Sequence, residues 1–363
     1  MRSVLHFKNK YFTIAVIVFF SQFASALKIY RIGNSHNVSP TTEPMVCLAG
    51  GGEDDYWSDG WKEMINRANG GDVVVIRADD DREEYESWIF DDTARHGFRK
   101  VNSVSTIILS NEADSSSKEL ISLIDHAEMI FFAGGDQYKY YRFIHGTKLE
   151  AALNRALKER KIPMAGTSAG MAILGDIDYI AQVDTQSDPI SNVSAKDVLI
   201  NPTGLFVTLD RGFLTPNYLD KVVTDTHFSQ RNRQGRLIGF MARATYNNYS
   251  DVNASNIKGI GADEGTAVCI NDNGIAKIYG TNSVHFLLGN HPIERLQSGS
   301  SLNWYGNKLA IKVYSISGLN SDTAEFDFKT WSGVGGQSKY WYIDGTYVDQ
   351  PFFGEKDLTT NEK

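Results

Sequence analysis

The chain of 363 residues contains only two cysteines, Cys47 and Cys269, and both lie in apolar, strand-like segments. So few cysteines exclude a small scaffold held together by several disulfides, although these two can either pair or remain buried free thiols. The chain also lacks a run of basic residues, and its formal net charge is −8. This acidic balance argues against general binding to nucleic acid.

Long apolar runs are missing after the N-terminal segment, and that segment is itself short for a bilayer span. It combines a basic start, an apolar core over 12–20 and small residues at 24–26. This order is typical of a secretory signal peptide, here residues 1–26, cleaved before Leu27. We therefore expect a secreted or periplasmic protein without stable membrane association. An uncleaved N-terminal anchor is the alternative.

After a polar lead, strand and helix patterns alternate along the chain. Apolar runs predict buried strands at 45–49, 72–77, 104–109, 127–133 and 163–166, and helical spacing predicts helices at 57–68, 118–126 and 149–160. Strands that alternate with helices in this way indicate parallel βαβ units with both sheet faces covered. The sequence therefore predicts an α/β fold.

The pattern changes in the second half of the chain. We expect strands over 198–209 and 221–226, a helix over 231–243 and a hairpin formed by 266–270 and 276–279. Aromatic and β-branched residues after Leu302 predict further strands. This organisation predicts an α/β domain over 27–300 and a β-rich C-terminal extension over 301–363, packed on the same domain.

Ser168 stands in the segment Gly166-Thr167-Ser168-Ala169-Gly170, directly after an apolar run. Glycines two positions before and after it allow a sharp turn from strand to helix, which exposes the hydroxyl and leaves an amide free for an oxyanion. The plainer interpretation is a serine that caps a helix. Two further glycine-rich loops, 50–55 and 134–137, also follow predicted strands. Because the carboxyl ends of parallel strands share one edge, we expect the three loops to converge.

A serine nucleophile needs a base, and the base needs a group that orients it. Among the eight histidines, His227 follows the apolar pair Val222-Val223 and precedes a predicted helix. That position would place its imidazole at the same rim as Ser168. The alternative is a strand-end histidine that pairs with Asp225.

Three arginines follow His227 within two turns, and two of them, Arg233 and Arg236, share a helical face. Arginine binds carboxylates bidentately, so this group suits an anionic substrate in an otherwise acidic chain. One or two of the three can equally be solvated surface residues.

Four motifs occur in a defined order: Phe132-Ala-Gly-Gly-Asp-Gln137, Gly166-Thr-Ser-Ala-Gly170, Asp225-Thr-His-Phe-Ser-Gln-Arg-Asn-Arg-Gln-Gly-Arg236 and Gly261-Ala-Asp-Glu-Gly-Thr-Ala267. Together they resemble the cyanophycinase family of serine peptidases, relatives of the α-aspartyl dipeptidase called peptidase E. The resemblance implies a flavodoxin-like, class I glutamine-amidotransferase-like and mostly parallel sheet with helices on both faces. It also implies a serine nucleophile without metal or cofactor, and small acidic peptide substrates with an α- or β-linked aspartyl residue on the acyl side.

By motif, Ser168 matches the nucleophile of that family and His227 its general base. The backbone amides of Gly135 and Ala169 would form the oxyanion hole. The positions expected to line the substrate pocket are Gln137, Asp225, Arg231, Arg233, Arg236 and Glu264. In this family an acidic residue between the serine and the histidine completes the triad. Ser187-Asp188-Pro189-Ile190 resembles the corresponding turn of peptidase E, which points to Asp188, with Asp184 as the second choice.

The chain departs from the family pattern at Thr226, where cyanophycinases usually carry glutamine, and in the long stretch 175–212. Because of these differences, the sequence does not identify the substrate, and we do not expect cyanophycin in particular. The expected function is an exported serine peptidase that cleaves after an aspartyl residue, and a homodimer is compatible with the sequence. One alternative is an α/β-hydrolase-type esterase or lipase, whose late base would be His285 or His291. The other is a catalytically silent protein that binds acidic peptides.

Overall fold

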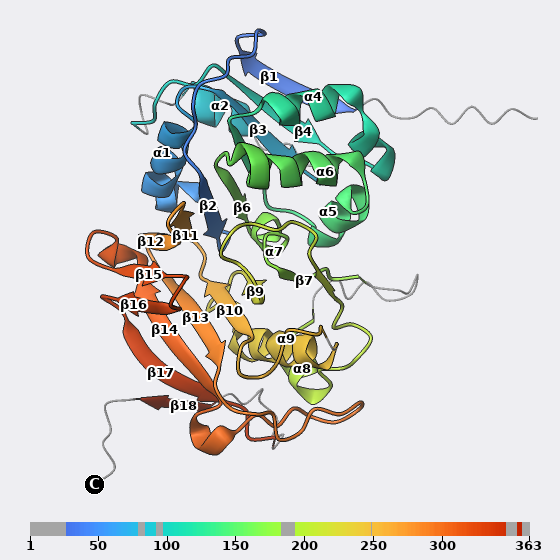
Figure 1. Cartoon of the computed structure of the whole chain (residues 1–363), viewed down its shortest axis with the longest axis vertical. Helices are drawn as coiled ribbons and strands as arrows, with labels where there is room; N and C mark the ends of the chain where they lie inside the picture. Colours follow the sequence, from blue (N-terminus) through green and yellow to red (C-terminus); the bar gives the residue numbers. More distant parts are fainter. Residues whose placement is uncertain are drawn as a thin grey trace, which may run out of the picture.

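The computed structural model of the chain describes residues 27–78, 84–91, 97–182, 193–247, 249–345 and 354–357. Within these ranges the strands form two sheets (Figure 1). One has ten strands in the order β1-β4-β3-β5-β6-β2-β11-β12-β15-β16, and the other has eight in the order β18-β17-β14-β13-β10-β9-β7-β8. The expected signal peptide, residues 1–26, lies outside the described residues.

Five adjacent strands of the ten-stranded sheet are parallel and confirm the predicted α/β pattern. They are β2 (Met45–Ala49), β3 (Asp72–Arg77), β4 (Ser103–Ile108), β5 (Met129–Phe132) and β6 (Met164–Thr167). An antiparallel strand, β1 (Lys28–Gly33), pairs with β4 at the edge. Every residue of β3 is buried, as its unbroken apolar run requires.

Helices cover both faces of these parallel strands. Val73 and Val75 pack toward α1 (Ser58–Arg67) and α2 (Tyr85–Phe90). Val74 and Ile76 point to the other face because side chains alternate along a strand. The helices that cover this other face are α4 (Lys118–His126), α5 (Gln137–Ile144) and α6 (Lys148–Arg155). Four short helical segments also lie in this part of the chain: η1 (Asp54–Trp57), η2 (Glu112–Ser116), η3 (Ala156–Arg160) and α7 (Ala169–Ala172).

The eight-stranded sheet is parallel only at its centre. There β9 (Val222–Asp225) runs parallel to β7 (Ile177–Tyr179) and to β10 (Lys258–Ala262). The antiparallel strands are β8 (Leu209–Arg211), β13 (Ser283–Gly289), β14 (Ile311–Ser317), β17 (Gln337–Tyr342) and β18 (Gly354–Asp357). Two 3₁₀ turns, η4 (Gly306–Lys308) and η5 (Gly318–Asn320), flank β14.

One face of this sheet packs against α8 (Ala195–Ile200) and α9 (Gln234–Tyr246). The strand expected over 198–209 is therefore wrong, because these residues form the second half of α8, a loop and the first residue of β8. The Ser194 side chain accepts from the Asp197 amide, and the Asp197 carboxylate accepts from the Ser194 amide, so a capping box starts the helix. Val198 and Leu199 then pack on α9.

The expected hairpin is confirmed as β11 (Thr266–Asn271) and β12 (Ile275–Gly280), but it belongs to the other sheet. Its partners β15 (Glu325–Asp327) and β16 (Ser332–Val334) extend the ten-stranded sheet. The chain leaves β10 in one sheet and enters β11 in the other through the three-residue turn Asp263-Glu264-Gly265. Within the described ranges, none of the helices has the length and apolar character needed to cross a bilayer.

The two cysteines lie opposite each other on β2 and β11 and form a disulfide. The bridge joins positions 222 residues apart, so it removes much of the freedom of the unfolded chain. We expect the variant Cys47→Ala/Cys269→Ala to lose about 2–5 kcal/mol of unfolding free energy. Urea denaturation of the variant, of the oxidised protein and of the reduced protein measures this. Equal midpoints for all three proteins would contradict the prediction.

Candidate active site

Ser168 occupies the turn between β6 and α7, with φ 52° and ψ −114°. This backbone region is unfavourable for a residue with a Cβ, and such strain recurs at nucleophile turns. The flanking glycines are sterically required. A Cβ on Gly166 would lie 2.3 Å from the backbone of Gly170, and one on Gly170 would lie 2.2 Å from the carbonyl oxygen of Phe132. The spacing of the glycines is therefore what permits the turn.

His227 follows β9 and lies against Ser168, although 59 positions separate the two residues (Figure 1 shows β6, α7 and β9 meeting in the middle of the molecule). Its Nε2 is 2.7 Å from the Ser168 hydroxyl oxygen, so the hydroxyl donates to the ring. The His227 amide donates to the Gly50 carbonyl at 2.7 Å. A Cβ on Gly51 would lie 2.4 Å from the imidazole, so this glycine lets the ring approach the loop.

Glu264, in the turn between β10 and β11, accepts a hydrogen bond from Nδ1 of His227 at 2.6 Å. Two contacts hold its backbone. The Glu264 amide donates to the Gln230 side chain at 3.0 Å, and its carbonyl accepts from the Asn282 side chain at 2.8 Å. The three side chains Ser168, His227 and Glu264 therefore form one continuous chain of hydrogen bonds.

This geometry changes the assignment of the third carboxylate. The sequence assigned it to Asp188, with Asp184 second, and both lie outside the described residues. The Nδ1 hydrogen of His227 goes instead to Glu264, which the motif comparison had placed in the substrate pocket. In the sequence, the motif Gly261-Ala-Asp-Glu-Gly-Thr-Ala267 was the available sign that Glu264 is part of the site. It follows His227 in the chain, whereas the third carboxylate was expected between Ser168 and His227.

The two expected oxyanion donors belong to the loop after β5 and to the first turn of α7, and both segments adjoin Ser168. Gly135 is exposed, has φ 141° and follows β5. A Cβ on its neighbour Gly134 would be 3.7 Å from the Cβ of Ser168, so this loop borders the nucleophile. Ala169 is the first residue of α7, where a backbone amide has no acceptor within its own helix. Amides in these positions can stabilise negative charge that develops next to Ser168.

Two of the three arginines point into the protein. Arg236 is buried and forms a bidentate ion pair with the buried carboxylate of Asp225. Arg233 donates to the carbonyl of Thr226 at 2.9 Å and lies 3.6 Å from Asp225. Burial lowers the pKa of Arg233 to about 10, so it stays charged at neutral pH. These residues form a buried cluster next to His227, and Asp225 and Arg236, both expected to contact substrate, contact each other inside the protein.

Arg231 is placed differently from the other two arginines. Half of its side-chain surface is exposed, and its Nε lies 3.9 Å from the carboxylate of Glu264. Of the three arginines, Arg231 therefore combines exposure with closeness to the hydrogen-bonded chain, so it can bind an anionic group on a substrate.

Gln137, the first residue of α5, was also expected to contact substrate. Its side-chain nitrogen donates to the Tyr179 carbonyl at 2.7 Å.

The two alternative bases are engaged elsewhere. The Nδ1 of His285 is 2.7 Å from the Ser315 hydroxyl, and burial lowers the pKa of His285 to about 4. His291 packs beside Gly306. Ser168 thus contacts the histidine at 227, and the arrangement favours this residue over both alternatives. Over the part of the chain that the structure describes, no group of three or more His, Cys, Asp or Glu side chains could hold a metal ion.

Burial lowers the pKa of His227 below its ordinary value of 6.5. The hydrogen bond to Glu264 acts in the opposite direction, whereas the cations of Arg231 and Arg233 lower the pKa further. The net decrease keeps the imidazole neutral at pH 7. A neutral Nε2 is what a general base requires.

On the acidic side of the pH profile, kcat/KM is therefore expected to fall with an inflection below pH 6.5, because protonation of His227 in the free enzyme removes the general base. The variant Arg231→Gln removes a cation that lowers this pKa, so its inflection should move to higher pH. A pH–rate profile of both proteins between pH 4 and 8 tests the prediction. An inflection above pH 7 in the unmodified protein, or a shift to lower pH in the variant, would contradict it.

Comparison with known proteins identifies the family. The sequence model of peptidase family S51 matches residues 82–278, more than half of the chain. A cyanophycinase from Synechococcus elongatus is 30% identical over 185 residues, which cover 51% of this chain and 49% of that protein. A cyanophycinase from Geminocystis herdmanii is 23% identical over 250 residues, which cover 67% and 80% of the two chains.

The chain therefore spans about half the length of its Synechococcus relative. Among solved structures, that of a peptidase from an acI-B1 actinobacterium aligns with 72% of this chain and 97% of its own, with a TM-score of 0.46 and 19% identity. The matched family segment contains Ser168, His227 and Glu264. The chain belongs to peptidase family S51.

Proposed function

We propose that the chain is an exported serine peptidase that hydrolyses peptide or isopeptide bonds on the carboxyl side of an aspartyl residue. The observation that carries this proposal is the hydrogen-bonded chain of Ser168, His227 and Glu264 beside the exposed guanidinium of Arg231. The first three side chains supply the hydrolytic chemistry. The fourth supplies a partner for a substrate carboxylate.

In this mechanism the Ser168 oxygen attacks the acyl carbon while its proton moves to Nε2 of His227. Glu264 stabilises the imidazolium through Nδ1, and the amides of Gly135 and Ala169 stabilise the oxyanion. The imidazolium then gives its proton to the leaving amine, and an ester to Ser168 remains. A water molecule, deprotonated by His227, hydrolyses this ester and restores the hydroxyl.

The aspartyl specificity follows from the position of Arg231. An aspartyl residue on the acyl side keeps one free carboxylate close to the reacting carbon, whether the bond is α- or β-linked. Arg231 can meet that carboxylate in both cases. The relatives named cyanophycinase support this class of substrate. This chain has Thr226 where cyanophycinases usually carry glutamine, and the two oxygens of Thr226 accept hydrogen bonds from Arg233. The proposal is therefore not extended to a particular polymer.

The variant Arg231→Ala is expected to lower kcat/KM for aspartyl dipeptides by about 10- to 100-fold, the scale of a lost charge-assisted hydrogen bond. The matched asparaginyl dipeptides lack the carboxylate, so their slower hydrolysis should hardly change. Arg243→Ala serves as the control. It removes another guanidinium, which belongs to α9 and donates a hydrogen bond to the Asn247 side chain. Equal losses on aspartyl and asparaginyl substrates would refute the aspartyl preference. A panel of α- and β-aspartyl dipeptides with the unmodified protein then identifies the linkage.

Export is supported by the N-terminal pattern of the sequence and by the disulfide between Cys47 and Cys269, since disulfides persist mainly in oxidising compartments. We expect the secreted or periplasmic fraction of the source cells to contain a chain that begins near Leu27. N-terminal sequencing of that protein tests this. A chain that starts at Met1 and stays with the membrane fraction would show an anchor instead.

A further inference from the structure

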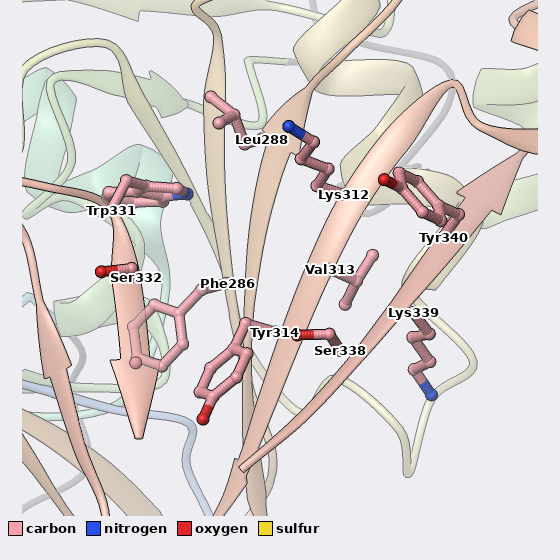
Figure 2. Close-up of a pocket in the computed structure, with 11 residues that line it drawn as sticks. Phe286, Leu288, Lys312, Val313, Tyr314, Trp331, Ser332, Ser338, Lys339 and Tyr340 are labelled. Carbon is pink, nitrogen blue, oxygen red and sulfur yellow. The ribbon is translucent and has the colours of Figure 1, made fainter. Parts of the chain in front are cut away.

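A pocket of about 300 Å³ lies on the eight-stranded sheet (Figure 2), and its lining contains none of Ser168, His227 and Glu264. Strands β13, β14 and β17 form its floor, and Trp331 and Ser332 at the start of β16 form a wall. A Cβ on Gly333 would lie 2.3 Å from the Tyr314 ring, so the backbone of β16 packs directly on β14. The pocket therefore lies where the edge of one sheet crosses the face of the other.

The strand register places two lysines on the sheet face that holds this pocket: Lys312 lines the pocket, and Lys258 lies beside its Trp331 wall. Directly paired residues of antiparallel strands point to the same face. The residues that pair in succession across β10, β13, β14 and β17 are Lys258, Leu288, Lys312 and Tyr340. The adjacent row on the same face contains Phe286, Tyr314 and Ser338. One face thus carries two ammonium groups, a leucine between them and a border of aromatic rings and hydroxyls.

The positive charge of this face is not neutralised by nearby acids. Within the described ranges, neither Lys258 nor Lys312 forms an ion pair, and the pocket has no acidic side chain in its lining. The Nζ of Lys258 lies 4.8 Å from the centre of the Trp331 ring. Burial lowers the pKa of Lys258, which means that its ammonium has lost part of its hydration without gaining a full counter-charge. Asp220 is the carboxylate that acts on it, and Asp220 pairs with Lys221.

We infer that this pocket binds an acidic sugar, with the anionic group beside Lys312 and the sugar ring against Trp331. The face of an aromatic ring carries partial negative charge and attracts the C–H groups of a pyranose ring. The hydroxyl groups of Ser332, Ser338 and Tyr340 can exchange hydrogen bonds with those of the sugar. A concave, largely apolar site with a few convergent polar groups is the usual form of a small-ligand pocket.

The site is separate from the hydrolytic centre. Lys258 begins β10, whereas Glu264 follows the opposite end of that strand. Substitutions in the pocket are therefore expected to leave peptidase activity unchanged. This separation also makes the inference independent of the proposed aspartyl specificity, because binding is measured without any peptide substrate.

Isothermal titration of the mature chain with three probes tests the inference: digalacturonate, the neutral disaccharide cellobiose, and sodium sulfate. We expect digalacturonate to bind at least about tenfold more tightly than either of the others, because only it offers both a ring and an anionic group. Its affinity should fall as salt rises, since exposed charges are screened. Equal binding of cellobiose, or sulfate that binds as tightly as digalacturonate, would overturn the assignment to an acidic sugar.

Two lysine variants sharpen this test. Lys312→Ala should weaken digalacturonate binding at least about tenfold. Lys277→Ala is the matched control, because Lys277 is exposed on β12 of the other sheet and is not among the residues that line the pocket. It should bind the probe as the unmodified protein does. Equal losses in both variants would overturn the inference, and unchanged kcat on a peptide substrate verifies that each variant is folded.

Discussion

The variant Ser168→Ala is expected to lose peptidase activity, with kcat reduced by about 10⁴-fold or more, the scale seen when serine-hydrolase nucleophiles are removed. The hydroxyl that donates to His227 at 2.7 Å is the atom that would attack the substrate. Alanine has the same difficulty as serine with a φ of 52°, so the turn gains no new strain. Steady-state kinetics and labelling with a fluorophosphonate probe measure the effect.

Ser229→Ala provides the matched control for this experiment. Ser229 lies two residues after His227, and the contact that holds it is made by its backbone amide, which donates to Asp263 at 2.8 Å and survives the substitution. We expect this variant to keep full activity and to be labelled, whereas Ser168→Ala is not labelled. If Ser168→Ala kept its activity with a normal melting temperature, the serine mechanism would have to be abandoned.

The variant Glu264→Gln is expected to reduce kcat by about 10⁴-fold, as replacement of the triad carboxylate by an amide does in serine peptidases. A carboxylate can only accept, so it fixes the proton on Nδ1 and leaves Nε2 of His227 free to take the proton of Ser168. A glutamine amide can donate to Nδ1 and favour the opposite tautomer. That tautomer carries its proton on Nε2 and cannot act as the base.

Asp188→Asn tests the competing assignment from the sequence. If Glu264 orients the imidazole, the Asp188 variant should retain most of the activity, because Nδ1 of His227 already has its acceptor. Kinetics of the two variants on one aspartyl substrate separate the assignments. A large loss in Asp188→Asn with near-normal Glu264→Gln would return the role to the aspartate.

Local patterns predicted the parallel half of the fold well. The run over 72–77 became β3 with the same bounds, because its four consecutive apolar residues, three of them β-branched valines followed by isoleucine, suit a short strand buried on both faces. The helix expected over 57–68 became α1, whose Trp61, Met64 and Ile65 are buried. In both cases the hydrophobic spacing itself determined the element.

Patterns that depend on packing were misread. The apolar pair Val198-Leu199 suits a strand as well as a helix, and contact with α9 determined the helix. The division into two sheets was not predicted, because the turn from β10 to β11 looks in sequence like any hairpin connection. Charge was equally ambiguous: Arg231, Arg233 and Arg236 look alike in sequence, yet two are buried against Asp225 and one is exposed.

The sequence by itself predicted the sharp turn at Ser168, the proximity of His227 and the family, since each depends on residue types at short, fixed spacing. Only the tertiary structure decided which carboxylate meets that histidine. Glu264 reaches His227 because the chain crosses from one sheet to the other at this turn, and the hydrogen bond depends on a distance of 2.6 Å in space. Contacts between segments far apart in the chain depend on how the sheets pack, so the spacing of residues along the sequence does not predict them.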